Sequence, residues 1–184
     1  MQEIIIFIPT IPSLLLEIFL ANPLAQIVGF LGFIVSLFTF LSKHDKTFLW
    51  RMTLSSFVWA IHFLLLGALS AGFLNSIDVI KNLLAIKYPF HKGIAVSIVI
   101  IYIIIGTLLF MKSGDWLDLL PVIASVASTI IIFTLKGVWM RIGFLIILAG
   151  WFTYNLNNHS IGGAITDIIL FITGCIGIYT KSKK

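Results

Sequence analysis

The sequence predicts an all-α membrane protein, in which seven transmembrane helices form two parallel three-helix bundles joined by a linker helix, after an N-terminal interfacial helix. Three observations predict this class: the composition, the length of the apolar runs and an internal repeat. The chain has 184 residues, of which 60% are hydrophobic and 10% charged, and its mean hydropathy is +1.14. A soluble domain is about 45–50% apolar and about 25% charged, so the composition indicates that the lipid bilayer is a main partner.

Residues 1–22 form an apolar segment that is interrupted by Pro9 and Pro12. A secretory signal peptide would begin with basic residues and end in a small-residue cleavage site, whereas this segment carries Glu3 and no Lys or Arg. We expect a short helix that lies on the outer leaflet and starts at Pro12 or Ser13. The alternatives are an additional membrane span and a segment that is cleaved or disordered.

Seven longer apolar runs follow, each close to the roughly 20 residues with which a helix crosses a bilayer core of about 30 Å. Backbone polar groups in lipid must be paired internally, which leaves helices or barrel strands. Barrel strands are about 10 residues long and alternate in polarity, whereas residues 94–102 are apolar on nearly every side. The runs therefore indicate helices, at 24–42, 50–67, 70–87, 93–111, 117–135, 139–156 and 161–180.

Two parts of the chain, 25–87 and 117–180, each contain three of these spans, and the span at 93–111 links them. Several residue types recur at an offset of 90 positions. These pairs are Arg51 and Arg141, Ser70 and Ser160, and Gly72 and Gly162. An acidic residue also recurs inside each third span, Asp78 and Asp167, at an offset of 89. Some membrane carriers place two like-oriented repeats around one central site in this way.

Lys and Arg follow the first, third, fifth and seventh spans and are scarce in the other loops. Because these residues concentrate on the cytoplasmic side of bilayer proteins, the start of the first span is expected outside and the C-terminus in the cytoplasm. The net charge of +5 reflects this topology, so we expect no nucleic-acid partner. The loops are too short for a soluble domain, and residues 23–184 are expected to form one membrane domain.

The third span carries the clearest set of polar residues at membrane depth. Asn75, Asp78, Lys81 and Asn82 follow helical spacing of three and four, so they share one face. Charged groups inside a bilayer are costly and usually face a cavity or a partner helix. This stripe is expected to line a polar interior, and the alternative is a purely structural network between helices.

The second, sixth and seventh spans add further candidates for a solute site. Trp59 and His62 lie three residues apart, and a neutral imidazole suits either a polar solute or a proton relay. The alternative for this His is a structural bond to a neighbouring backbone or hydroxyl group. The second half supplies matching material, namely Trp151, Asn155, Thr166 and Asp167. Two aromatic rings on matched spans could stack on a flat or ring-shaped solute.

No motif in the chain indicates an enzyme, and no catalytic residues, metal ligands or cofactors are expected. Ser125, Ser128 and Thr129 give the fifth span a small-residue face, which favours close helix packing first and function second. Cys175 stands alone in the last span, so no intrachain disulfide is possible.

Several blocks of the chain resemble the YgjV family of bacterial inner-membrane proteins, from about residue 24 to the end. These blocks are residues 62–67, 119–123 with 128–129, 136–137 with 140–141, and 160–163. The resemblance implies an inner-membrane location and kinship with the MtN3/PQ-loop superfamily, which includes the SWEET and SemiSWEET sugar carriers. It further implies a SWEET-like fold, in which each triple packs in the spatial order one, three, two.

SWEET-type carriers bind sugar between an Asn on the third helix and an Asn on the seventh, and the resemblance implies a similar site in this chain. Here Asn75 or Asn82 would supply the first, and Thr166 or Asp167 would replace the second, because the seventh span has no Asn. Most of the hinge prolines of those carriers are also missing. Any hinges would then move to glycines, at Gly29, Gly32, Gly143 and Gly150.

Taken together, these features favour a small-solute transporter that works by alternating access around a polar site in mid-bilayer. The substrate would be a sugar, nucleoside or vitamin-like molecule, and the two carboxylates suggest proton or cation coupling. The alternative is a non-transporting receptor or interaction module on the same fold. A chamber of a few hundred cubic ångströms would favour the carrier and a packed interior the module. The sequence leaves the oligomeric state open.

Overall fold

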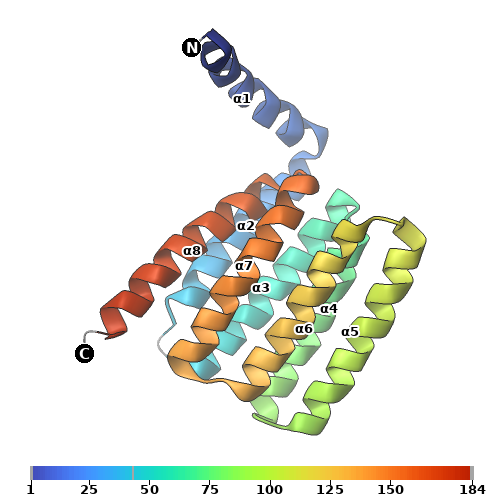
Figure 1. Ribbon diagram of the computed structural model, residues 1–184, viewed down its shortest axis with the longest axis vertical. Coiled ribbons are helices and arrows are strands. Elements are labelled where there is room, and N and C mark those ends of the chain that lie inside the picture. The colour runs from blue at the N-terminus through green and yellow to red at the C-terminus, as the bar shows by residue number, and fades with distance from the viewer. Residues whose placement is uncertain (1, 43, 183–184) are drawn as a thin grey trace.

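The computed structural model describes residues 2–42 and 44–182, with side chains described for 12–42 and 44–176. Within these ranges the chain is all-helical, with no strand (Figure 1). The helices are α1 (Gln2–Ala21), α2 (Pro23–Phe40), α3 (Asp45–Leu66), α4 (Leu69–Lys87), α5 (Lys92–Ser113), the 3₁₀ turn η1 (Trp116–Asp118), α6 (Leu119–Thr134), α7 (Gly137–Asn157) and α8 (Ile161–Ser182).

Six of the expected spans are long and apolar enough to cross a membrane: α2, α3, α4, α5, η1 with α6, and α7. The seventh expected span coincides with α8, whose described side chains cover the shorter apolar stretch Ile161–Ile176, so its crossing stays a prediction. The largest boundary difference is at α3, which begins at Asp45 rather than at residue 50. An acidic residue in a first turn stabilises a helix start, but a hydropathy pattern detects only the apolar part.

The six helices α2, α3, α4, α6, α7 and α8 form a closed ring in which each packs against the next, and α8 packs back against α2. Helix α5 lies outside this ring against α4 and α6, as Figure 1 shows. The two triples run in the same direction, because the single helix α5 joins the end of one to the start of the other (Figure 1). This arrangement encloses a central space between the two halves.

The order of helices within each triple differs from the order one, three, two that the resemblance implies. Helix α3 packs between α2 and α4, and α7 packs between α6 and α8, so the spatial order is one, two, three. Short connections explain this order, because helices joined by a few residues become antiparallel neighbours. The α3–α4 turn, for example, needs only Gly67, which adopts a left-handed conformation (φ 78°), and Ala68.

The segment 1–22 is helical almost throughout, since α1 begins at Gln2 and includes both prolines. The expected start at Pro12 or Ser13 was therefore wrong. Helix α1 extends from one end of the bundle and touches α2 and α8 (Figure 1). Its placement on the membrane surface stays a prediction.

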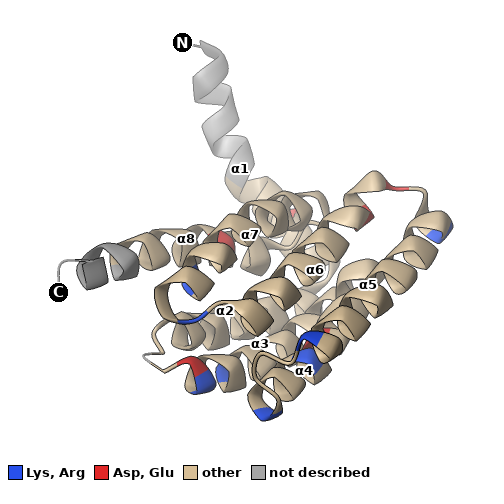
Figure 2. Ribbon diagram, turned by 60° about the horizontal axis from the view of Figure 1, so that its bottom comes forward, with Lys and Arg blue, Asp and Glu red and all other residues tan. Residues whose placement is uncertain are grey.

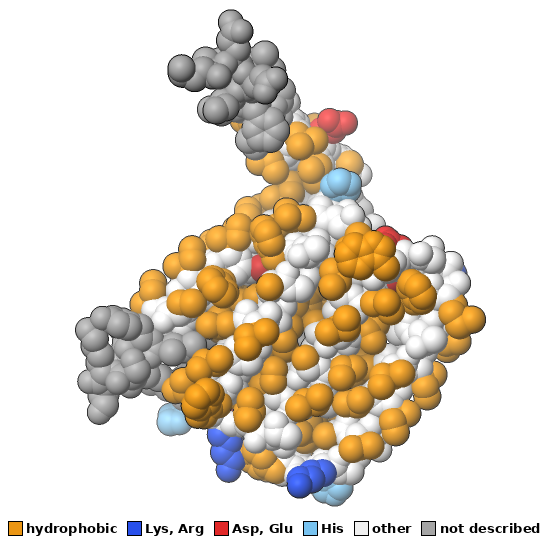
Figure 3. Space-filling model, in the orientation of Figure 1, with side chains coloured by type: hydrophobic (Ala, Val, Ile, Leu, Met, Phe, Trp, Pro, Cys, Tyr) orange, Lys and Arg blue, Asp and Glu red, His pale blue; other side chains and the backbone are white. Residues whose placement is uncertain are grey.

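Charged residues are few, and most of them lie near the ends of the helices (Figure 2). Most described Lys and Arg residues lie at the end where the α2–α3, α4–α5 and α6–α7 connections meet. The face seen in Figure 3 is dominated by hydrophobic side chains between these ends. Such a belt fits a bilayer environment, and the positive-inside rule predicts that the basic end is cytoplasmic.

At the basic end, Arg141 connects the two halves of the ring. Its Nη1 lies 3.2 Å from Asp45 Oδ1, and its Nη2 donates a hydrogen bond to the carbonyl oxygen of Ser42 at 2.9 Å. The repeat-related Arg51 donates to the carbonyl oxygen of Phe38 at 2.6 Å. Both arginines therefore bind the C-terminal end of α2, where unpaired carbonyl groups favour a cation.

At the opposite end, α2 and α8 approach closely at two glycines. A Cβ placed on Gly162 would lie 2.7 Å from the carbonyl carbon of Gly29, and a Cβ on Gly29 would meet the ring of His62. The proposed hinge glycines Gly29, Gly32 and Gly143 thus all pack tightly, whereas Gly150 has open space around its Cα.

Replacing Gly162 with Ala should lower the stability of the protein by about 1–3 kcal/mol, because backbone atoms cannot move aside as a flexible side chain can. The apparent melting temperature in detergent micelles measures this change. Gly150→Ala is the matched control, since nothing lies within 4 Å of the added methyl group. It should be neutral or stabilising by up to about 1 kcal/mol, and equal melting temperatures for the two variants would contradict the close approach.

Candidate functional site

The ring encloses a cavity of about 120 Å³ to which all six of its helices contribute. One water molecule needs about 10–15 Å³, so the space suits several waters or a solute of a few heavy atoms. It is smaller than the chamber of a few hundred cubic ångströms expected for a carrier of sugars. The residues with polar atoms that line it are Ser36, Thr39, Ser55, Ser56, Trp59, Asn75, Asp78, Ser125, Ser128, Trp151, Asn155, Thr166 and Asp167.

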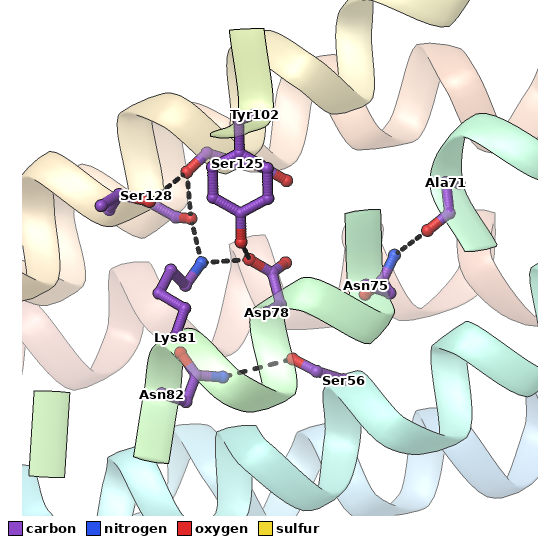
Figure 4. Close-up of polar contacts among 10 residues, drawn as sticks. Ser56, Ala71, Asn75, Asp78, Lys81, Asn82, Tyr102, Ser125 and Ser128 are labelled. Atoms are coloured by element: carbon purple, nitrogen blue, oxygen red, sulfur yellow. Dashed lines mark hydrogen bonds and ion pairs between the residues drawn. The ribbon is translucent and has the colours of Figure 1, made fainter. Parts of the chain in front are cut away.

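Asp78 of α4 stands at the centre of a hydrogen-bonded network, shown in Figure 4. Its Oδ1 atom forms an ion pair with Lys81 and accepts a hydrogen bond from the Tyr102 hydroxyl at 2.5 Å. Lys81 also donates to the Ser128 hydroxyl of α6 at 2.6 Å. The lysine is 1% exposed and the aspartate 7%, so each charge is compensated inside the bundle by the other.

The two asparagines of α4 have different surroundings (Figure 4). Asn75 lines the cavity and donates to the carbonyl oxygen of Ala71 at 2.9 Å. Asn82 is fully buried, does not line the cavity, and donates to the Ser56 hydroxyl at 3.3 Å. The polar stripe of α4 is therefore buried along its whole length, and its N-terminal part, Asn75 and Asp78, lines the cavity.

Asp167 of α8, the repeat-related acid, has a simpler environment than Asp78. Asn155 of α7 donates to Asp167 Oδ2 at 2.7 Å, and no ion pair to this carboxylate is found among the described side chains. Position 170, which lies where Lys81 would repeat at the same offset of 89, is Leu170. Thr166 donates to the carbonyl oxygen of Gly162 at 2.6 Å. The two acids thus line one cavity with unequal partners.

Two polar atoms in the cavity wall are buried without a hydrogen-bond partner in the part of the chain that the structure describes. They are Ser125 Oγ and Asn155 Oδ1. Unpaired buried polar atoms are uncommon in folded proteins, so each one calls for an explanation. Both atoms are covered by their protein neighbours, and Asn155 Oδ1 lies against Gly163 of α8.

Aromatic rings line the cavity toward both ends of the helix ring. On one side, the Phe63 and Trp151 rings stack at 5.8 Å between centroids, and Trp59 lies 5.9 Å from Phe63. Trp59 is held by its Nε1, which donates to the Ser36 hydroxyl at 3.0 Å. On the other side, Phe40 and Phe144 line the cavity near the basic end. These rings occupy space that would otherwise widen the chamber.

His62 lies outside the cavity and is completely buried. Its Nδ1 lies 2.7 Å from the carbonyl oxygen of Ala25, and its Nε2 lies 2.7 Å from the Ser160 hydroxyl. A carbonyl oxygen can only accept, so in the neutral ring Nδ1 carries the hydrogen and Nε2 accepts from Ser160. The imidazole of His62 thus connects α3 to α2 and to the start of α8. This is the structural role that the sequence analysis gave as the alternative to solute binding.

The structure gathers seven of the nine candidate residues around the cavity and leaves His62 and Asn82 outside it. Sequence reasoning missed Tyr102, which binds Asp78, and several small polar residues of the cavity wall. Tyr102 is the only tyrosine in the mostly apolar linker span, and its hydroxyl at mid-span is itself a signal. Ser36 and the pair at 55–56 were small polar residues at mid-span, which read as ordinary packing positions.

Comparison with known proteins supports one family. The sequence model of the Imp-YgjV family, described as "Bacterial inner membrane protein", matches residues 23–184. A relative from Escherichia coli (strain K12), "Inner membrane protein YgjV", is 30% identical over 144 residues, which cover 78% of this chain and 76% of that protein. No solved structure matches the chain. The chain therefore belongs to the YgjV family of bacterial inner membrane proteins.

Proposed function

We propose that this protein is a small-solute carrier of the bacterial inner membrane, with no enzymatic activity, and that the structure represents a closed conformation. The carrying observation is a cavity that is lined by polar side chains of both repeats and contains two carboxylates at membrane depth. Buried acids are costly inside a bilayer and are commonly found on solute or ion pathways. Their presence also suggests that solute movement is coupled to a proton or another cation.

Contacts at both ends of the ring support the closed state. The Arg141 contacts join the halves at the basic end, and His62 and the close glycines join them at the other. Alternating access would require these contacts to open in turn. The three-one-three plan is shared with PQ-loop carriers, but the helix order differs from the SWEET order, so we extend only the general mechanism to this chain.

A receptor or interaction module is the second candidate, and the small volume of the cavity favours it. A space of about 120 Å³ lies below the roughly 300–1,000 Å³ of common ligand pockets. A module would keep this interior closed, whereas a carrier would expose it to each side in turn.

Thiol accessibility distinguishes the two candidates. Ser125 is a suitable probe position, because it lines the cavity and its hydroxyl makes no hydrogen bond that a Cys would lose. We expect a Ser125→Cys variant, made in a Cys175→Ser background, to react with a membrane-impermeant methanethiosulfonate reagent from either side of sealed vesicles. The fraction labelled from each side is read by mass spectrometry.

The matched control is Ser97→Cys, since Ser97 is exposed on the outer surface of α5 and would face lipid. Lipid-facing thiols react poorly with hydrophilic reagents, so this variant should stay unlabelled. Absence of labelling at position 125 from both sides, in a protein that remains folded, would reject the carrier and leave the module.

The substrate class can be narrowed by thermal-shift screening of the purified protein against sugars, nucleosides, vitamins and small amines. A ligand that binds only the folded state raises its apparent stability by mass action. The small cavity predicts that hits come from the smallest solutes in the panel.

A further inference from the structure

The two repeats place an acid in the same cavity but neutralise only one of them. Asp78 is paired with Lys81 and receives the Tyr102 hydroxyl. Asp167 receives one amide hydrogen bond from Asn155. The position that would repeat Lys81 is a leucine, and Tyr102 belongs to the linker helix, which has no counterpart in the second half. The asymmetry is therefore built into the sequence.

This difference leaves the Asp167 carboxyl group without a positively charged partner among the described side chains. An ionised carboxylate buried without an opposite charge is strongly unfavourable, and Asp167 is only 7% exposed. A bound cation would supply the missing charge. Asn155, another residue of the cavity wall, donates to Asp167 Oδ2 and so holds the carboxylate in place.

The remaining wall indicates which kind of cation fits. Trp59, Phe63 and Trp151 line the same cavity, and aromatic faces, Trp most of all, attract organic cations. A divalent metal ion such as Ca²⁺ is usually held by several carboxylates among its six or more oxygen ligands, whereas the described residues contain no cluster of three His, Cys, Asp or Glu side chains that could hold a metal. The volume of about 120 Å³ restricts the ligand to a few heavy atoms.

We propose that the cavity binds a small organic ammonium ion, with Asp167 as its counter-ion and the tryptophans around its apolar part. This inference rests on the proposed carrier function, because it names the substrate class of that site. Asp78, already neutralised by Lys81, then serves to fix the opposite wall.

Binding of ethylammonium to the protein in lipid nanodiscs tests the proposal. Saturation-transfer NMR at constant ionic strength compares ethylammonium with ethanol and acetate, which are similar in size but neutral and anionic. We expect saturable binding of ethylammonium alone. Asp167→Asn should weaken it roughly 10- to 100-fold, because a hydrogen bond to a charged group contributes about 1.5–3 kcal/mol.

The matched control is Asp115→Asn, the same substitution at an exposed acid outside the cavity, which should leave the affinity within about twofold, as distant surface changes usually do. If Asp167→Asn does not fold, Trp151→Leu provides a second variant, with an expected several-fold loss from the missing cation–π contact. Equal binding of ethanol, undiminished binding to the folded Asp167→Asn variant, or no saturable binding of ethylammonium would each overturn the proposal.

The Ser125→Cys labelling separates this inference from the carrier proposal. Labelling from both sides without ethylammonium binding would keep the carrier and reject the ammonium ion as its substrate class. Ethylammonium binding without labelling from either side would keep the cation site and reject transport, which would make the protein a receptor.

Discussion

Replacing Lys81 with Met should destabilise the protein by about 3–5 kcal/mol. This is the largest loss of stability that we expect from a single substitution in this protein. The change leaves the buried Asp78 carboxylate with the Tyr102 hydroxyl as its remaining partner and removes the donor to Ser128. The cost arises from an uncompensated charge rather than from lost volume, because Met fills nearly the same space. The apparent melting temperature and the yield of monodisperse protein in detergent measure this loss.

Two further variants show whether charge is the cause. Lys87→Met makes the same change on the same helix at an exposed position, and it should alter stability by less than about 0.5 kcal/mol. The double variant Asp78→Asn with Lys81→Met removes both charges and should recover most of the stability, as replacing a whole buried ion pair often does. A double variant no more stable than Lys81→Met would show that the pair is not the origin of the effect.

His62→Ala should lower stability by about 2–4 kcal/mol without changing which solutes the protein binds. The substitution creates a void beside Gly29 and breaks the contacts with Ala25 and Ser160, and both the void and the unpaired polar groups are costly. Chemical denaturation in mixed micelles measures the first effect, and the thermal-shift panel measures the second.

His44→Ala is the control for this substitution, since His44 is exposed and its side chain makes no capping hydrogen bond at the start of α3. It should be nearly neutral. Selective loss of one ligand in a His62→Ala variant of unchanged stability would return this residue to the solute site, as one reading of the sequence had it.

Much of the fold follows from local physics that the sequence displays directly. Residues 69–87 were expected as a span at 70–87, because an apolar run in lipid must pair its own backbone. Gly67 lies in the turn before this helix, because its left-handed conformation (φ 78°) favours glycine. Helix order was not accessible in this way, since it depends on which faces pack together, and the resemblance suggested an order that the short connections do not produce.

For the candidate site too, burial could be predicted from the sequence, whereas the contacts between helices could not. The burial of Asp78 and Asp167 could be expected because charged groups are too costly to face acyl chains. The hydrogen-bond partners of these acids could not be predicted, because the spacing of residues on a helix shows which of them share a face but not which residues of other helices they contact. Tyr102 of the linker helix donates to Asp78, and Ser128 of the second repeat accepts from Lys81. Only the tertiary packing brings these residues together.

The sequence by itself determined that this protein is a bundle of apolar helices, with its basic residues at one end and its costly polar groups turned inward. Those properties follow from free energies of transfer that each residue carries wherever it is placed. The tertiary structure alone decided that Tyr102 and Ser128 complete the network around Asp78 and Lys81, that His62 holds helices together, and that the cavity is small. These are properties of contacts between distant residues, which exist only once the ring has closed.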